Sequence, residues 1–143
     1  MSGIVGSKLN VRGSGIVAKL GTDGQVLTSA GAGVSAAFEA ASGGGTSWQS
    51  VETGSTLTAV AGNGYPVNTT AQACTATLPA GSAGDEVSFI DYARTFDTNN
   101  LTVESDSSEK IYGSTDDLTV AVEGAGFTLV YVDATQGWLL KDK

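Results

Sequence analysis

Hydrophobic residues in the second half of the chain recur in short clusters that alternate with polar positions. From Trp48 onward, the clusters follow one another at intervals of about ten residues, and Gly, Asn, Asp and Ser fill the intervals. This spacing is typical of an all-β fold, so we expect a small antiparallel β-sandwich or barrel-like domain with no helix after Trp48. The clusters lie at residues 57–60, 65–67, 74–78, 87–90, 101–103, 111–112, 118–122, 127–132 and 138–140.

Alternation within the clusters predicts which side chains face the core. Cys74, Ala76 and Leu78 fall on one face of a strand, and the threonines between them fall on the other. Residues 118–122 alternate in the same way. Residues 127–132 are apolar on both faces. We therefore expect that strand to be central, or to be buried on its second face by a partner subunit.

Turn residues divide the clusters. Asn63-Gly64 predicts a β-hairpin, because a type I′ turn needs a positive φ at both of its central residues. Pro66 has no N–H to donate to a ladder, so we place its strand at the edge of a sheet. Further loops are expected at residues 81–85, 97–100 and 105–108.

Residues 1–47 are expected to form an extended, glycine-rich arm followed by a linker. Eleven of the 20 glycines lie at or before Gly45, and they separate apolar pairs that are too small to close a core alone. We expect other subunits to bury these pairs; the alternative is a disordered N-terminus. Residues 42–47 have the composition of a flexible linker. The chain is therefore divided into an attachment and oligomerisation segment at 1–47 and an independently folding β-domain at 48–143.

The net charge of −8 at pH 7 is concentrated in the second half of the chain. Residues 51–143 carry 13 acidic and 4 basic side chains, whereas residues 1–50 carry a net charge of +1. An acidic surface repels phosphate groups, so we expect neither nucleic acid nor a membrane as a partner. We expect no signal peptide and no transmembrane segment, and therefore synthesis in a cytoplasm. The single cysteine, Cys74, implies no intrachain disulfide.

The residues of common catalytic and metal sites are missing or stand in the wrong context. The chain has no histidine, which rules out Ser-His-Asp and Cys-His constellations and, with one cysteine, a zinc site within a monomer. Cys74 is expected in the core. Residues 13–18 fit G-x-G-x-x-A, but glycines follow where a dinucleotide-binding helix would run. We therefore expect no enzyme activity, no catalytic residue, no cofactor and no metal.

The acidic residues of the second half are the remaining candidates for chemistry. A carboxylate pair could serve a glycosidase, and a group of carboxylates could hold Ca²⁺. Most of these residues stand next to Gly, Ser, Thr or Asn, where an Asp side chain accepts hydrogen bonds from the backbone of a turn. We therefore expect structural roles for Asp85, Glu86, Asp91, Asp97, Asp116, Asp117 and Asp133.

Aromatic side chains are candidate contacts with a partner subunit or with a ligand. At strand positions they usually complete a core or an intersubunit seam, which is the interpretation we favour. Aromatic residues that alternate with polar ones also suit the stacking of sugars. Trp138 begins the last expected strand, and we expect it to hold the C-terminus on the sheet. The candidates are Trp48, Tyr65, Tyr92, Phe127, Tyr131 and Trp138.

Two stretches resemble virion proteins of bacteriophages. The opening MSGIVGSKLNVRGSG and the segment LGTDGQVLTSAGAGVSAAFE at 20–39 are similar to the N-terminal segments of marine phage virion proteins. The second half resembles a small β-module of phage tail and head fibres. The resemblance covers nearly the whole chain. The elements shared with the β-module are Leu78-Pro79, Gly84-Asp85, Asn99 to Val103, Ile111 with Gly113, and Gly137-Trp138.

The resemblance implies a non-enzymatic structural protein of the virion surface, acting as a capsid decoration, a head fibre or a tail fibre. The fibre modules are usually trimeric, so it also implies a homotrimer, attached to other virion proteins through residues 1–47. The alternative is a carbohydrate-binding module that recognises a host surface glycan during adsorption. A capsule-polysaccharide hydrolase is a third possibility, which the missing histidine and the weak carboxylate pattern disfavour.

Overall fold

A computed structural model describes the chain in segments that belong to two compact units. The units are residues 1–44 and 45–143, and each is described by itself. The division falls inside the expected glycine-rich linker, of which residues 42–44 lie outside the described residues. The described residues are 3–5, 8–11, 15–19, 25–28, 37–40, 45–107 and 109–142.

The described segments of the first unit are short antiparallel strands that pair locally. Such pairing was not part of the expectation of an extended arm. Gly13 and Ser14 of the G-x-G-x-x-A pattern lie outside the described residues, and its other residues belong to a strand. One sheet has the order β1 (Gly3–Val5), β2 (Lys8–Val11) and β3 (Gly15–Lys19), and β4 (Gln25–Thr28) pairs with β5 (Ala37–Ala40).

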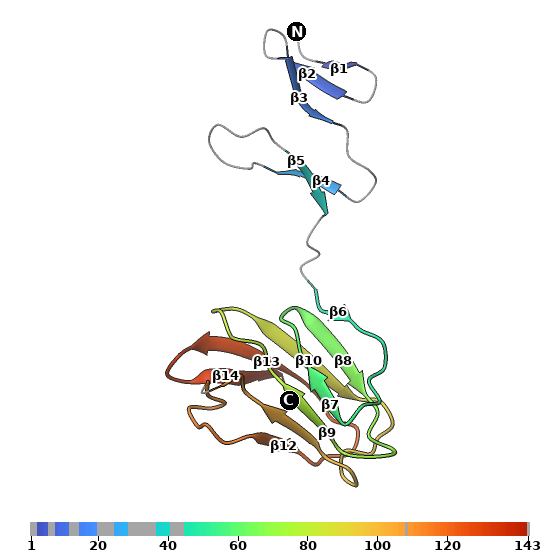
Figure 1. The fold of residues 1–143 in the computed structure, drawn as a ribbon, viewed down its shortest axis with the longest axis vertical. Coiled ribbons are helices and arrows are strands. Elements are labelled where there is room, and N and C mark those ends of the chain that lie inside the picture. The colour runs from blue at the N-terminus through green and yellow to red at the C-terminus, as the bar shows by residue number, and fades with distance from the viewer. Residues whose placement is uncertain are drawn as a thin grey trace. The chain divides into compact units, whose positions relative to one another are not determined.

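The second unit is a sandwich of two β-sheets (Figure 1), and its described residues contain no helix. The all-β prediction is therefore confirmed for this unit. The five-stranded sheet has the order β14 (Gly137–Asp142), β13 (Gly126–Asp133), β10 (Glu86–Asp91), β8 (Asn63–Val67) and β6 (Ser47–Trp48). The four-stranded sheet has the order β12 (Leu118–Val120), β11 (Leu101–Glu104), β9 (Cys74–Thr77) and β7 (Thr56–Thr58).

From β6 to β11, successive strands alternate between the two sheets. Two consecutive strands of one sheet are separated in sequence by one strand of the other sheet. They therefore run parallel to each other. Thus β8 is parallel to β6 and β10, and β9 is parallel to β7 and β11. The prediction of an antiparallel sandwich is wrong for this part, which winds as a flattened coil. Alternation reports the buried face of a strand and carries no information on its direction.

Two local predictions about β8 are wrong, each for its own reason. Asn63 and Gly64 lie inside β8, and the turn comes before them, where Gly62 has a φ of 83°. The strands on either side of this turn belong to different sheets, so they form no hairpin. Pro66 does not lie in an edge strand, because β6 pairs with the outer side of β8. Its missing N–H is tolerated because β6 ends at Trp48.

The core lies between the two sheets and follows the predicted alternation. Cys74, Ala76 and Leu78 are all at most 1% exposed. In β10, Val87 and Phe89 enter the core, so the residues between and beyond them point to the other side of the sheet. Strand β13 lies between β14 and β10, which confirms that residues 127–132 occupy an interior strand.

The C-terminal strands close the coil with antiparallel pairs, β11 with β12 and β10 with β13 and then β14. Trp138 in β14 is fully buried, and its backbone N–H donates to the carbonyl of Lys110 at 2.8 Å. Gly137 has a φ of 71°, and a Cβ there would overlap the Lys110 carbonyl, so glycine is required. The burial of Trp138 is the arrangement that we expected for the end of the chain.

Candidate binding groove

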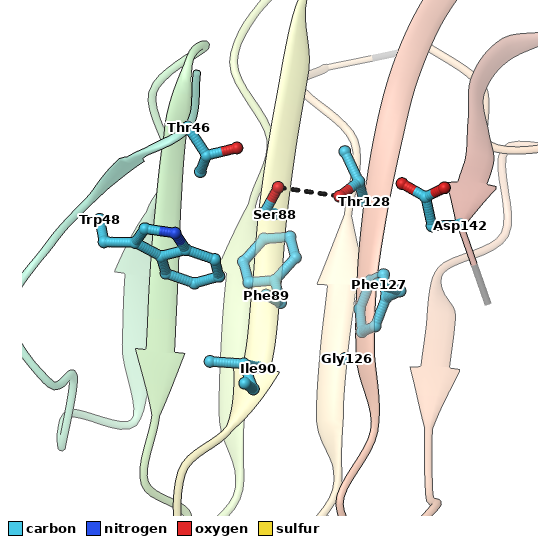
Figure 2. A pocket seen from close by; sticks show the side chains of 9 residues that line it. All are labelled: Thr46, Trp48, Ser88, Phe89, Ile90, Gly126, Phe127, Thr128 and Asp142. Atoms are coloured by element: carbon cyan, nitrogen blue, oxygen red, sulfur yellow. Dashed lines mark hydrogen bonds between the residues drawn. The ribbon is translucent and has the colours of Figure 1, made fainter.

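One residue from each strand of the five-stranded sheet forms a continuous row on the face that points away from the core, here called the outer face. Cα pairing runs from β6 to β14 across all five strands. Side chains from this row line a shallow groove of about 280 Å³ (Figure 2). Ile90 and Gly126 contribute from the neighbouring row. The row consists of Trp48, Gly64, Ser88, Thr128 and Asp142.

Trp48 forms one wall of the groove and depends on Gly64 for its position. A Cβ on Gly64 would lie 2.7 Å from Cε3 and 2.9 Å from Cδ2 of the indole, so the ring lies directly over the glycine. Only a residue without a side chain permits this approach. The Trp48 side chain is nevertheless 55% exposed. The groove therefore presents an aromatic surface that is supported from beneath and open to solvent.

The floor of the groove carries a pair of hydroxyl groups. Ser88 Oγ and Thr128 Oγ1 are 2.9 Å apart and hydrogen-bonded to each other, as the dashed line in Figure 2 shows. One O–H hydrogen is used in this bond, so the second hydroxyl can donate outward. Gly126 leaves the adjacent floor open, because a Cβ there would meet its nearest atom, Ile90 Cγ1, at 3.8 Å.

The electrostatic character of the groove is set by one carboxylate at its end. Asp142 is the only charged residue among those that line it. The neighbouring Lys141 is engaged elsewhere, since its Nζ lies 2.9 Å from Glu86 Oε1. The hydrogen bond to Glu86 raises the pKa of Lys141 above its ordinary value. Among the residues that the structure describes, no cationic side chain therefore lines the groove.

The six aromatic candidates separate into core and surface residues. Tyr65, Phe127, Tyr131 and Trp138 are each at most 9% exposed and belong to the core. Tyr92 is 58% exposed and lies after β10, outside the groove. Trp48 alone among the six combines an exposed ring with a place in the groove; Phe127 reaches the groove from a buried position.

The core aromatics are packed against one another. The Tyr65 and Phe89 rings are stacked with centroids 6.0 Å apart, and the Phe89 and Phe127 rings lie at 5.5 Å. The Tyr65 hydroxyl accepts a hydrogen bond from the Val60 N–H at 2.9 Å, which satisfies the polar end of a buried side chain. These rings stabilise the sandwich that carries the groove.

The buried carboxylate of Asp91 holds two loops. It accepts hydrogen bonds from the backbone N–H groups of Thr95, Phe96 and Gly124 at 3.0–3.1 Å. Burial by itself raises the pKa of this carboxyl, but the backbone hydrogen bonds, which include one from Arg94, outweigh it and leave the pKa lowered. Asp91 thus joins the loop after β10 to the turn before β13.

The other acidic candidates and Cys74 also have contacts that are typical of structural roles. Asp85 accepts from the Ser82 N–H, and Asp133 accepts from the N–H groups of Thr135 and Gln136. In the described part of the chain, no group of three or more His, Cys, Asp or Glu side chains is arranged to hold a metal ion. Burial, together with the charge of Glu52, raises the pKa of the Cys74 thiol.

A second, apolar groove of about 250 Å³ lies on the side of the sandwich where β12 and β14 form the edges of their sheets. We call it the side groove. All of the residues that line it are uncharged. They are Leu118, Thr119, Val120, Ala121, Val122, Phe127 and Leu140.

Sequence patterns did not identify most of the outer-face groove. The sequence did not mark small residues such as Ser88, Thr128 and Gly126 as part of a binding surface. Which residues lie beside them depends on which strands pair. The parallel pairing of β8 with both β6 and β10 brings Trp48 beside them. An available signal was the alternation in β10, which places Ser88 and Ile90 opposite Val87 and Phe89.

Comparison with known proteins adds no assignment: no protein-family model matches the chain, and no curated protein matches it. Among the residues that the structure describes, none lies in a helix long and apolar enough to cross a bilayer.

Proposed function

We propose that this protein is a non-enzymatic structural component of the surface of a bacteriophage particle, as a capsid decoration, a head fibre or a tail fibre. Residues 1–47 attach it to other virion proteins, and the β-domain faces outward. The sequence resemblance to virion proteins supports this assignment, as does the two-sheet fold of the second unit. The protein is made in the host cytoplasm and resides in the virion.

The main observation behind the structural proposal is that several acidic side chains accept hydrogen bonds within the β-domain. Asp85, Asp91 and Asp133 each bind backbone N–H groups of loops. Glu109 accepts from the Gly81 N–H at 2.9 Å and from the Trp138 indole at 3.3 Å. Carboxylates engaged in this way rigidify connections between strands, which suits a module that must persist outside the cell.

We further propose that the β-domain associates with copies of itself as a cyclic oligomer, with three-fold symmetry favoured by the resemblance to fibre modules. The second half of the chain carries a net charge of −9, so identical copies repel one another over most of their surface. The side groove offers an apolar, uncharged contact surface. Val122, which is 64% exposed, lies in it.

Immunogold electron microscopy tests the location. An antibody against residues 48–143 should label the surface of intact particles, at the capsid or at the tail. Labelling only of lysed cells, with none on purified particles, would contradict the proposal. Analytical ultracentrifugation of the full chain tests assembly, and a clean monomer at micromolar concentration would contradict the oligomer.

The outer-face groove favours a second candidate function, a carbohydrate-binding module for host adsorption. An exposed indole beside hydroxyl groups and a carboxylate combines an apolar face with a few polar groups, which suits the binding of a sugar. In this alternative, the protein acts by binding a host glycan in the groove, and the rest of the β-domain only supports that groove. A glycan array separates the two candidates, because a purely structural protein retains no glycan.

A further inference from the structure

We infer that the outer-face groove binds the uncharged pyranose ring of a glycan, stacked on the indole of Trp48. This inference rests on the second candidate function above and names its ligand class. It does not depend on where the protein sits on a particle.

The first argument is the way in which Trp48 is held. Gly64 lies beneath the indole, and Thr46 Cγ2 would be 2.6 Å from a Cβ at Gly64, so the space beside the ring is also occupied. The ring is therefore positioned before any ligand arrives, while 55% of the side chain remains exposed. An aromatic platform that is already ordered loses little conformational entropy on binding, and its flat apolar face matches the C–H face of a pyranose.

The second argument is the chemistry beside the platform. Stacking on Trp48 leaves the edge of a sugar, where its hydroxyl groups lie, beside the floor and the end of the groove. The Ser88–Thr128 pair can donate one O–H hydrogen, and the carboxylate of Asp142 can accept from sugar hydroxyls. A hydrophobic peptide anchor would leave these polar groups without partners. The mixture of one aromatic face and several polar groups therefore favours a sugar.

The third argument is charge. Of the described residues that line the groove, Asp142 alone is charged, and Lys141 is held by Glu86 at 2.9 Å. A uronic or sialic acid would bring a second carboxylate next to Asp142, and no cationic side chain in the described lining compensates it. This charge therefore favours a neutral sugar over an acidic one.

The two tryptophans provide an internal control for the test. The full-length, ¹⁵N-labelled protein gives two indole N–H signals, and a Trp48→Phe variant identifies which belongs to Trp48. Methyl glucopyranoside, methyl N-acetylglucosaminide and sodium glucuronate are then titrated separately. We expect saturable shifts of the Trp48 signal with at least one of the neutral sugars, in the millimolar range that is usual for single rings. The signal of the buried Trp138 should stay fixed.

Variants connect the shifts to the groove. In a glycan array read with the full-length chain, Trp48→Ala should lose at least tenfold in affinity, and Thr128→Val, which removes a hydroxyl at nearly constant shape, should lose severalfold. Tyr92→Ala is the matched control, because Tyr92 is 58% exposed but lies outside the groove. Unchanged melting temperatures of Trp48→Ala and Tyr92→Ala show that any loss reflects binding.

Three results would overturn the inference. The first is the absence of any shift of the Trp48 signal with either neutral sugar at tens of millimolar. The second is binding of glucuronate as tightly as the neutral sugars. The third is a Trp48 fluorescence that acrylamide does not quench in the full chain, which would mean that residues 1–44 or a second copy cover the groove. None of these affects the immunogold result, so failure of the binding site and failure of the virion assignment are distinguishable.

Discussion

The indole of Trp138 meets the ring of Tyr131 edge to face, with ring centroids 5.5 Å apart and ring planes at 69°. The Tyr131 ring also covers Gly81, where any side chain would overlap it. Glu109 completes the group, because it accepts hydrogen bonds from both Gly81 and Trp138. The last two strands and the loop after β9 are therefore fastened at one point.

Replacing Trp138 should destabilise the β-domain severely. Trp138→Ala removes a fully buried indole and its hydrogen bond to Glu109, and truncation of a buried aromatic costs about 3–5 kcal/mol. We expect a sharp fall in the melting temperature measured by circular dichroism, with glycan retention unchanged in the protein that remains folded. Trp48→Ala, at an exposed position, is the control and should change the melting temperature little. An unchanged melting temperature for Trp138→Ala would contradict the packing described here.

Asp91 should make the stability of the β-domain depend on pH. Its folded-state pKa is lowered, so the ionised form stabilises the fold above the ordinary pKa of an aspartate. This contribution is lost as the pH falls through the ordinary value and then through the lowered one. Urea unfolding of the wild type below about pH 4 should show this loss.

The Asp91→Asn variant isolates that contribution. We expect it to lose about 2–4 kcal/mol at neutral pH, because one acceptor oxygen is replaced by a donor facing backbone N–H groups. The loss should shrink as the pH falls. Asp97→Asn, at an exposed loop position, is the matched control and should lose little at any pH. A constant difference between Asp91→Asn and the wild type from pH 7 to pH 3 would contradict this role.

Two glycines on the outer face should respond differently to the same substitution. Gly64→Ala must displace the Trp48 ring, whereas Gly126→Ala meets nothing closer than 3.8 Å. We expect Gly64→Ala to increase acrylamide quenching of Trp48 and to weaken glycan retention, and Gly126→Ala to leave the quenching unchanged. Equal quenching of Trp48 in the two variants would mean that Gly64 does not position the indole.

The side groove can be tested by placing a charge in it. Val122→Asp should weaken self-association in sedimentation velocity, since each copy would bring a new carboxylate to the contact. Val60→Asp adds the same charge at a position that is 55% exposed and lies outside the side groove. Dissociation by both variants alike would indicate general repulsion and not this contact.

Sequence patterns predicted the parts of the fold that depend on burial. The alternation around Cys74 and Leu78 identified a core face, and the doubly apolar residues 127–132 identified an interior strand. Strand direction and partner were not predictable in this way. Asn63-Gly64 is a common hairpin dipeptide, but the change of sheet before β8 places it inside a strand. Tertiary pairing overrode the local turn preference there.

The candidate groove was only partly predictable for the same reason. Trp48 was among the aromatic candidates, but its partners come from four other strands and are small or polar. A row such as Gly64, Ser88, Thr128 and Asp142 exists only once five strands are in register. The sequence separations between these residues carry no periodic signal.

The flattened coil also determines the order in which the domain is completed during synthesis. Strands β6 to β11 leave the ribosome before β13 and β14, so the edge of β10 that pairs with β13 stays open until those strands follow. Pairings between residues so distant in sequence form slowly, because the chain must first close long loops. A nascent chain that stops before Trp138 presents an unsealed apolar interior to cellular proteases and chaperones. The six residues of β14 therefore complete the core, because they bring in the fully buried Trp138.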